Sequence, residues 1–145
     1  MNKISLASYP PGVSASIATP RNASLGELIS EACSTYADRP ALVQDGNALT
    51  YTQLDTLSTQ LAAFLATDLS LRPGERVALM MPNILAYPLA ICAVLRAGCV
   101  VVNVNPMYTP RELKHQLRDS GARAIIVAEP FLATVNALVA QTSVD

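Results

Sequence analysis

The chain has 145 residues, of which 51% are hydrophobic and only 14% are charged, and its formal net charge at pH 7 is -1. A chain without an excess of basic residues gives no electrostatic reason to expect binding to nucleic acid or to anionic lipid. A typical soluble domain carries about 25% charged residues, so we expect part of the folded surface to be covered. The cover could be the rest of a longer polypeptide, a partner subunit or a membrane, and the patterns along the chain favour the first.

Residues 1–23 are rich in serine, proline and alanine, a composition typical of a partly disordered arm laid over a surface. The first residues lack the apolar core and cleavage site of a secretory signal, which favours a cytoplasmic location. The three cysteines, Cys33, Cys92 and Cys99, show no metal-ligand spacing, so we expect reduced, buried thiols.

A change of pattern at Ser24 predicts the start of an α/β part that spans residues 24–145. Ser24-Leu25-Gly26-Glu27 resembles a capping box and opens a helix that ends before Pro40. The apolar positions that give this helix its spacing are Leu25, Leu28, Ile29, Ala32 and Cys33.

A β-hairpin is predicted near Ala41 to Tyr51, because two short extended runs, Ala41–Val43 and Leu49–Tyr51, flank the turn dipeptide Asp45-Gly46. Thr52 then opens a second helix, whose leucine stripe predicts one buried face. The stripe consists of Leu54, Leu57, Leu61 and Leu65.

The run Arg76–Met81 follows the turn pair Pro73-Gly74 and predicts a buried strand. Pro82-Asn83 offers an N-cap for the next helix, which Gly98 ends. The apolar stretch Val77–Leu95 is almost long enough to cross a membrane, but prolines interrupt it, so a strand followed by a helix is the better interpretation.

Val100–Val102 is β-branched throughout and predicts a second buried strand, followed by the polar loop Asn103–Tyr108. Thr109-Pro110-Arg111-Glu112 fits an N-cap, a first-turn proline and a glutamate that bonds back to the cap, so a helix should begin there and stop at Ser120-Gly121.

Ala124–Ala128 predicts a third strand, and Glu129-Pro130 starts a last helix whose core-facing residues are Phe131, Leu132, Val135, Leu138 and Val139. Strands that alternate with helices through short connections predict an α/β fold with a mostly parallel sheet, right-handed crossovers and flanking helices.

The chain carries no recognisable catalytic motif. Its six glycines are dispersed, so neither a phosphate-binding loop nor a dinucleotide fingerprint is present, and a Rossmann-type oxidoreductase is a weak hypothesis. The single histidine, His115, falls on the polar side of a predicted helix, and the carboxylates are scattered through caps and turns. No catalytic, cofactor-binding or metal-binding residue is therefore assigned.

The loop Asn103–Tyr108 is the one candidate site, because ligands of parallel sheets bind beyond the carboxyl ends of the strands. We take Asn105, Pro106 and Tyr108 as its substrate-proximal residues. The alternative is structural: the asparagines and proline shape a tight turn, while Met107 and Tyr108 fill a neighbouring domain.

Five segments of the chain stand out together: Leu49–Leu54, Pro73–Ala78, Met81–Asn83, Leu95–Gly98 and Val102–Leu113. They closely resemble the amino-terminal part of bacterial long-chain fatty acyl-CoA synthetases, which are adenylate-forming enzymes. The resemblance extends from about Leu25 to Val127, and its last segment favours long-chain fatty acyl enzymes over acetate, aryl or amino acid relatives. One departure is Gln53, where the family commonly has glutamate.

This resemblance implies part of the large amino-terminal domain of an adenylate-forming enzyme. In the full-length enzyme a fatty acid carboxylate attacks ATP to give an acyl-adenylate and pyrophosphate, with assistance from magnesium, and the thiol of CoA then displaces AMP. The family's phosphate loop, its adenine and ribose contacts and its catalytic lysine all come later than the matching region. The isolated chain is therefore expected to bind no cofactor and to be inactive.

The resemblance also implies the partners. They are the remainder of the synthetase polypeptide, and fatty acid and CoA for the full-length enzyme, with peripheral membrane association of that enzyme as a further expectation. An incomplete domain exposes apolar surface and a sheet edge, so we expect the isolated chain to self-associate or to be marginally stable. The competing hypothesis is a stand-alone α/β module that binds an acyl ligand or a protein partner without catalysis.

Overall fold

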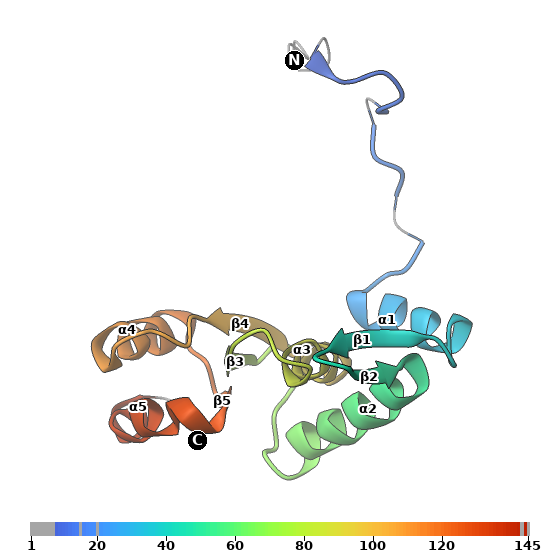
Figure 1. Ribbon diagram of the computed structural model, residues 1–145. Coiled ribbons are helices and arrows are strands. Elements are labelled where there is room, and N and C mark those ends of the chain that lie inside the picture. The colour runs from blue at the N-terminus through green and yellow to red at the C-terminus, as the bar shows by residue number, and fades with distance from the viewer. Residues whose placement is uncertain (1–7, 15, 20, 143, 145) are drawn as a thin grey trace.

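The computed structural model describes residues 8–14, 16–19, 21–142 and 144. Part of the predicted arm, residues 1–7, 15 and 20, lies outside the described residues. The described residues between 8 and 19 are exposed and run away from the body of the molecule (Figure 1).

The body alternates strands and helices as the sequence predicts. In chain order the elements are α1 (Leu25–Thr35), β1 (Pro40–Gln44), β2 (Asn47–Thr50), α2 (Tyr51–Thr67), β3 (Arg76–Met80), α3 (Ala86–Arg96), β4 (Val100–Val104), α4 (Pro110–Ser120), β5 (Ala124–Val127), the 3-10 turn η2 (Glu129–Phe131), α5 (Leu132–Asn136) and the 3-10 turn η3 (Val139–Gln141).

A parallel sheet in the order β4-β3-β5 forms the centre of the body. In Figure 1 the sheet is seen along its edge, with α4 and α5 on one side and α3, α2 and the β1–β2 hairpin on the other. These two helical layers confirm the predicted α/β fold with a parallel sheet flanked by helices. The connection from β3 to β4 and the connection from β4 to β5 run in opposite directions across the sheet. Because right-handed crossovers are the rule, the helices of these two connections lie on opposite faces.

The side chains of β3 alternate between two hydrophobic clusters, one on each face of the sheet. Val77 and Leu79 pack in the cluster that α2 and α3 cover, whereas Ala78 and Met80 pack beneath α4 and α5. All four side chains are fully buried. This explains why β3 is apolar at successive positions, since both faces of a central parallel strand are covered.

The predicted hairpin is confirmed: β1 and β2 pair antiparallel around Asp45 and Gly46, which both have positive φ angles of 49° and 79°. Its predicted end was wrong by one residue, because Tyr51 belongs to α2. The Thr50 hydroxyl accepts from the Gln53 N–H at 3.2 Å, and the Gln53 side chain accepts from the Thr50 N–H at 2.9 Å. This reciprocal cap fixes the helix start, and glutamine serves in it as glutamate would.

The predicted N-cap of α3 was wrong. The helix starts at Ala86, three residues after Asn83, and its N-cap residue Leu85 makes no side-chain cap bond. Instead, Gln44 at the end of β1 accepts a hydrogen bond from the Leu85 N–H at 2.9 Å and donates one to the Asn83 carbonyl at 3.3 Å. A residue from the hairpin therefore supplies the cap.

Three helix faces were predicted to be more buried than they are. On α1 the side chains of Leu25 and Leu28 are exposed, while Cys33 is buried, because α1 lies at the periphery and packs on α2 and α3 through one edge only. Leu57 on α2 and Leu132 on α5 are likewise exposed. β4 also runs two residues further than predicted, through Asn103 and Val104.

The N-terminus of α4 carries the predicted capping box, and its carboxylate gives the fold a pH dependence. Glu112 accepts hydrogen bonds from the Thr109 hydroxyl at 2.7 Å and from the Thr109 N–H at 2.9 Å, and these bonds lower the pKa of the carboxyl group. A lowered folded-state pKa means that the stabilisation is present above the unfolded pKa and is lost as the pH falls through the folded one.

We expect Glu112→Gln to reduce the acid sensitivity of the fold, because glutamine still accepts the cap bonds but does not titrate. Melting temperatures followed by circular dichroism should fall less for Glu112→Gln than for the unchanged chain as the pH drops below 4.5, the ordinary pKa of the group. Identical acid profiles for the two proteins would contradict this role of the cap.

Candidate functional site

The predicted loop lies where β4 ends, and the side chain of Asn105, the first residue after β4, holds its backbone. The Asn105 carboxamide oxygen accepts from the Met107 N–H at 2.9 Å, and the Asn105 carbonyl accepts from the Tyr108 N–H at 3.1 Å. Asparagine commonly closes such a turn with its own side chain. Asn105 and Pro106 therefore shape the turn, whatever else they contact.

The two large side chains of the loop differ in their surroundings. Tyr108 is half-buried and packs on the cluster beneath α4 and α5, as Val102 and Phe131 also do. Met107 is 79% exposed. The loop therefore carries one apolar side chain, that of Met107, that has no packing partner among the described residues.

Two polar side chains from different helices bond to Asn103 near the end of β4. The Tyr87 hydroxyl of α3 donates to the Asn103 carboxamide oxygen at 2.8 Å, and the Gln116 side chain of α4 donates to the Asn103 carbonyl at 2.8 Å. Asn103 was predicted to lie in the loop but belongs to β4, and neither Tyr87 nor Gln116 was predicted as a site residue. The signal that could have found them is an asparagine inside an otherwise β-branched strand.

The strand order places the topological switch point between β3 and β5, because the helices that follow these strands cover opposite faces of the sheet. Ligands of open α/β sheets bind beyond the carboxyl ends of strands at such a point. The segments there are Met81–Asn83 after β3 and Ala128–Glu129 after β5. The Asn105–Tyr108 loop adjoins this position from the other side of β3.

A shallow hollow of about 240 Å³ lies next to the end of β3, between the hairpin and the start of α3. Val43 on its rim is 70% exposed, and Gln44 in its wall makes the two hydrogen bonds to the segment before α3. The hollow is apolar for the most part, and the Gln44 and Tyr87 side chains in its wall already make hydrogen bonds.

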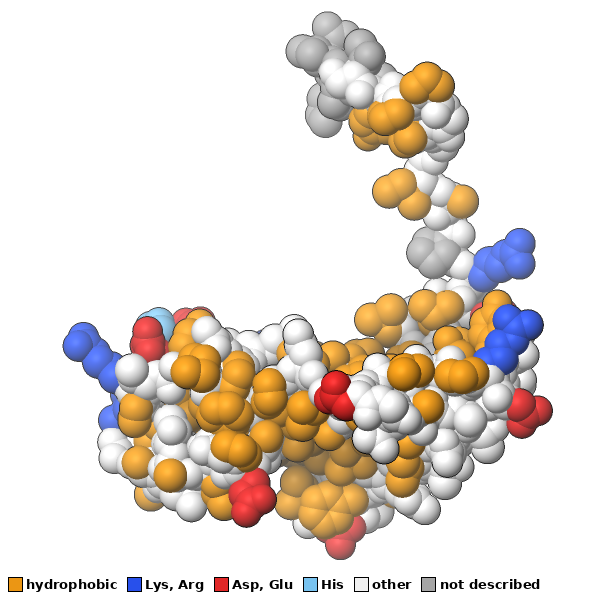
Figure 2. Space-filling model, viewed as in Figure 1, with side chains coloured by type: hydrophobic (Ala, Val, Ile, Leu, Met, Phe, Trp, Pro, Cys, Tyr) orange, Lys and Arg blue, Asp and Glu red, His pale blue; other side chains and the backbone are white. Residues whose placement is uncertain are grey.

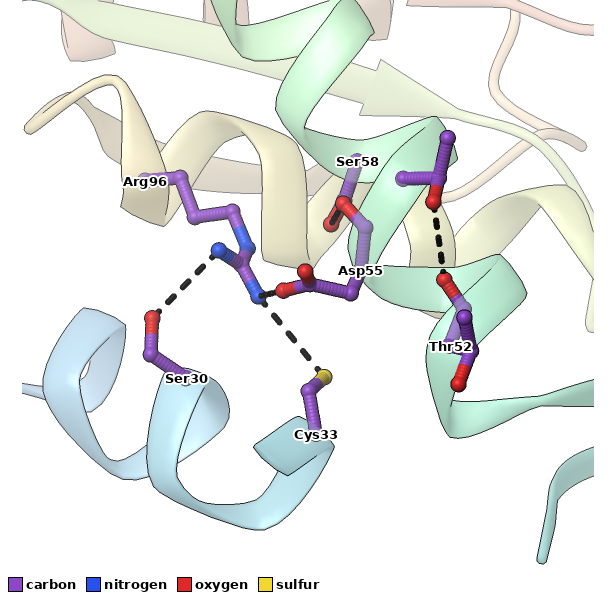
Figure 3. A network of polar contacts seen from close by, with 7 residues as sticks. Ser30, Cys33, Thr52, Asp55, Ser58 and Arg96 are labelled. Carbon is purple, nitrogen blue, oxygen red and sulfur yellow. Dashed lines mark hydrogen bonds and ion pairs between the residues drawn. The ribbon is translucent and has the colours of Figure 1, made fainter. Parts of the chain in front are cut away.

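Arg96 at the end of α3 ties together the three helices on one side of the sheet (Figure 3). Its guanidinium contacts Asp55 of α2 at 2.5 Å, the Ser30 hydroxyl of α1 at 3.3 Å and the Cys33 sulfur at 3.7 Å. The Arg96 side chain is only 14% exposed, whereas that of Asp55 is 47% exposed. The contacts join structural elements, and the ion pair is partly screened by solvent.

The ionisable groups supply no reactive centre in the described part of the chain. Burial raises the pKa values of Cys33, Cys92 and Cys99, so these thiols stay neutral near pH 7. His115 is exposed on α4. No group of three His, Cys, Asp or Glu side chains among the described residues could hold a metal ion.

Within the described residues, every helix is too short or too polar to span a bilayer.

The chain matches a known family of enzymes. A family model described as AMP-binding enzyme matches residues 29–145. The long-chain-fatty-acid–CoA ligase of Salmonella typhimurium strain LT2 is 51% identical over 145 residues, which is 100% of this chain and 26% of the relative. The enzyme of the same name from Yersinia pestis is 49% identical over 144 residues, 99% of this chain and 26% of the relative. The chain spans about a quarter of the length of these relatives.

Solved structures give the same result for the fold. A long-chain-fatty-acid-CoA ligase from Archaeoglobus fulgidus superposes with a TM-score of 0.79 and 25% identity, over 89% of this chain and 27% of that one. A benzoate CoA ligase from Burkholderia xenovorans LB400 superposes with a TM-score of 0.78 and 28% identity, over 84% of this chain and 25% of that one. Sequence and fold agree, and the chain belongs to the AMP-binding enzyme family.

Proposed function

We propose that this chain is the amino-terminal part of an ATP-dependent long-chain fatty acid–CoA ligase. The observation that carries the proposal is the 51% identity to a long-chain-fatty-acid–CoA ligase over the full length of the chain. The segment Val102–Leu113 supports the choice of a long-chain fatty acid as substrate, because it is the part of the resemblance most specific to those enzymes.

The complete ligase would join a fatty acid to CoA in two steps. The carboxylate oxygen attacks the α-phosphorus of ATP, which forms the acyl-adenylate and releases pyrophosphate. The sulfur of CoA then attacks the acyl carbon, which forms the thioester and releases AMP. Magnesium would supply charge neutralisation in the first step, but no cluster of ligands for it occurs in the described part of this chain, so none of these residues receives that role.

The contribution of this chain would be structural and positional. We assign residues 24–145 to an α/β subdomain of the larger domain and residues 1–23 to an arm. Asn105, Pro106 and Tyr108 would border the substrate, because their loop adjoins the carboxyl end of β3 at the switch point of the sheet. The full-length enzyme would be cytoplasmic and would associate with membranes only peripherally.

The experiment is to measure acyl-CoA formation from oleate, ATP and CoA by the isolated chain and by a chimera. The chimera joins this chain to the part of the Salmonella typhimurium relative that lies beyond the matched 26%. We expect the chimera to form oleoyl-CoA and the isolated chain to form none. A folded chimera without activity would argue against the proposal.

The stand-alone module remains the second hypothesis, and one binding measurement distinguishes it. Saturable binding of oleate by the isolated chain, at one site and in a monomer, would favour the module. Binding that requires the chimera would favour the ligase.

We also expect the isolated chain to self-associate. Hydrophobic side chains occupy much of one face of the body (Figure 2), and an exposed apolar surface of this kind favours association. Sedimentation velocity at increasing concentration should show oligomers. A monodisperse monomer with a high, two-state melting transition would contradict this expectation.

A further inference from the structure

The charges of the chain are unevenly distributed, although its formal net charge is only -1. Residues 76–145 contain six of the ten arginines and lysines but only four of the eleven carboxylates. Residues 1–75 contain the other four cations and the other seven carboxylates. An asymmetry of this kind does not show in the net charge, yet it can orient a protein on a charged surface.

Four basic side chains gather on the outer face of α4. They recur at intervals of three or four residues and therefore share one side of the helix. Leu113 and Leu117 are fully buried and fix the opposite side of α4 against the body. The four basic residues are Arg111, Lys114, His115 and Arg118.

The basic side chains surround a shallow hollow of about 440 Å³, whose wall also includes Asp119. Arg111 and Arg118 are exposed, and neither makes an ion pair or a side-chain hydrogen bond with the described residues. Lys114 donates only to a neutral group, the side chain of Gln141, at 2.6 Å. The cations that border the hollow are therefore not neutralised by an ion pair among the described residues.

The carboxylates of α4 offset this charge only in part. Glu112 and Asp119 are seven residues apart, so they lie together along one flank of the basic face. Glu112 is engaged at the N-terminus of the helix, where it accepts two hydrogen bonds from Thr109. Three permanent cations against two carboxylates leave an excess of positive charge on the outer face.

A face of this composition favours an aqueous surface over a protein neighbour. Burial against another part of the polypeptide would require a partner for each charge, since an unpaired buried charge is very costly. The exposed side of α1 differs, because Leu25 and Leu28 offer apolar area to a neighbouring segment. We therefore expect the outer face of α4 to stay accessible in the complete enzyme.

We propose that the outer face of α4 docks the complete ligase on anionic lipid bilayers. The inference rests on the proposed function for its substrate. A long-chain fatty acid partitions into bilayers because its CH₂ groups favour hydrocarbon over water, and its ionised carboxylate adds negative charge to the membrane surface. Each lysine or arginine close to an anionic membrane strengthens binding by about fivefold. Three such cations give a reversible contact.

Vesicle flotation with the chimera tests the docking. We expect binding to vesicles of phosphatidylcholine with phosphatidylglycerol, little binding to phosphatidylcholine alone, and release at high salt, which screens the charges. The double variant Arg111→Gln/Arg118→Gln should bind at least about tenfold more weakly. The matched control, Arg21→Gln/Arg72→Gln, removes two exposed cations from the acidic half of the chain and should bind as the unchanged chimera does.

Lysine substitutions separate charge from side-chain geometry. Arg111→Lys/Arg118→Lys should retain binding, because a membrane surface responds to the charge and does not require the planar fork of arginine. Equal binding by the glutamine variant and the unchanged chimera would overturn the inference. Absence of binding by a folded chimera would also overturn it, and would leave this face to solvent or to an acidic protein.

An activity assay separates this inference from the proposed function. With oleate in non-ionic detergent micelles, the glutamine variant should form oleoyl-CoA as fast as the unchanged chimera. With oleate in the anionic vesicles, its KM should rise at least about fivefold with little change in kcat. Activity in micelles without vesicle binding removes the docking surface and leaves the ligase. Vesicle binding that depends on Arg111 and Arg118, without activity in either medium, leaves the docking surface and removes the ligase.

Discussion

Replacing Leu79 by alanine should destabilise the chain by about 2 to 5 kcal/mol, because it removes buried apolar atoms and leaves a cavity in the core. Leu79 is fully buried in the middle of β3, and its cluster includes Leu65 of α2 and Val94 of α3. A domain of ordinary stability unfolds with about 5 to 15 kcal/mol, so this loss is a large part of the total. Urea denaturation should show a much lower midpoint with an unchanged slope.

Leu57→Ala is the matched control for Leu79→Ala, because it removes the same atoms from a side chain that is 40% exposed on α2. Its effect should stay within about 0.5 kcal/mol. If both variants lost the same stability, β3 would not be the centre of the core.

Gly98→Ala should cost about 2 to 3 kcal/mol, which combines a backbone penalty with a steric one. Gly98 ends α3 with a φ angle of 72°, and a Cβ atom there would lie 3.2 Å from the Cβ of Pro73. The Pro73 ring cannot rotate away, and the Gly74 N–H donates to the Gly98 carbonyl at 2.8 Å, which holds the two turns together. Thermal melts of the variant should show the loss.

The control for Gly98 is Gly46→Ala in the hairpin turn. Gly46 has a φ angle of 79°, but a Cβ atom there would meet no other atom within 4 Å. Alanine at Gly46 should therefore cost only the backbone penalty, about 1 to 2 kcal/mol. Equal losses at the two glycines would mean that the Pro73 contact relaxes freely.

Elements with their own local signals could be predicted from the sequence. The Asp45-Gly46 turn supplies the positive φ angles that its hairpin requires, and Thr109 with Glu112 caps α4 through bonds within one turn of the chain. The start of α3 could not be predicted in this way. Its cap comes from Gln44, which lies 41 residues before Leu85 and meets it only in the folded chain.

Burial was harder to predict than secondary structure. The spacing of Leu25 and Leu28 is that of a buried helix face, yet both are exposed, because spacing defines a face without saying what covers it. None of the described residues buries either side chain, so the expectation of a covered surface stays a prediction at this position.

The candidate site was predictable only in part. The position of the loop after β4 follows from the alternation of strands and helices. The turn at Asn105 follows from the tendency of an asparagine side chain to bond to the backbone two residues later. The meeting of Tyr87, Asn103 and Gln116 depends on the order of the strands and on which face each helix covers. Neither is encoded in the spacing of residues within one segment.

The most direct measurement is the exchange of labelled pyrophosphate into ATP in the presence and absence of oleate, with the isolated chain and the chimera side by side. Oleate-dependent exchange by the chimera, together with none by the isolated chain, is the predicted result. Exchange by the isolated chain would contradict the account, because it would place the adenylation chemistry within these 145 residues.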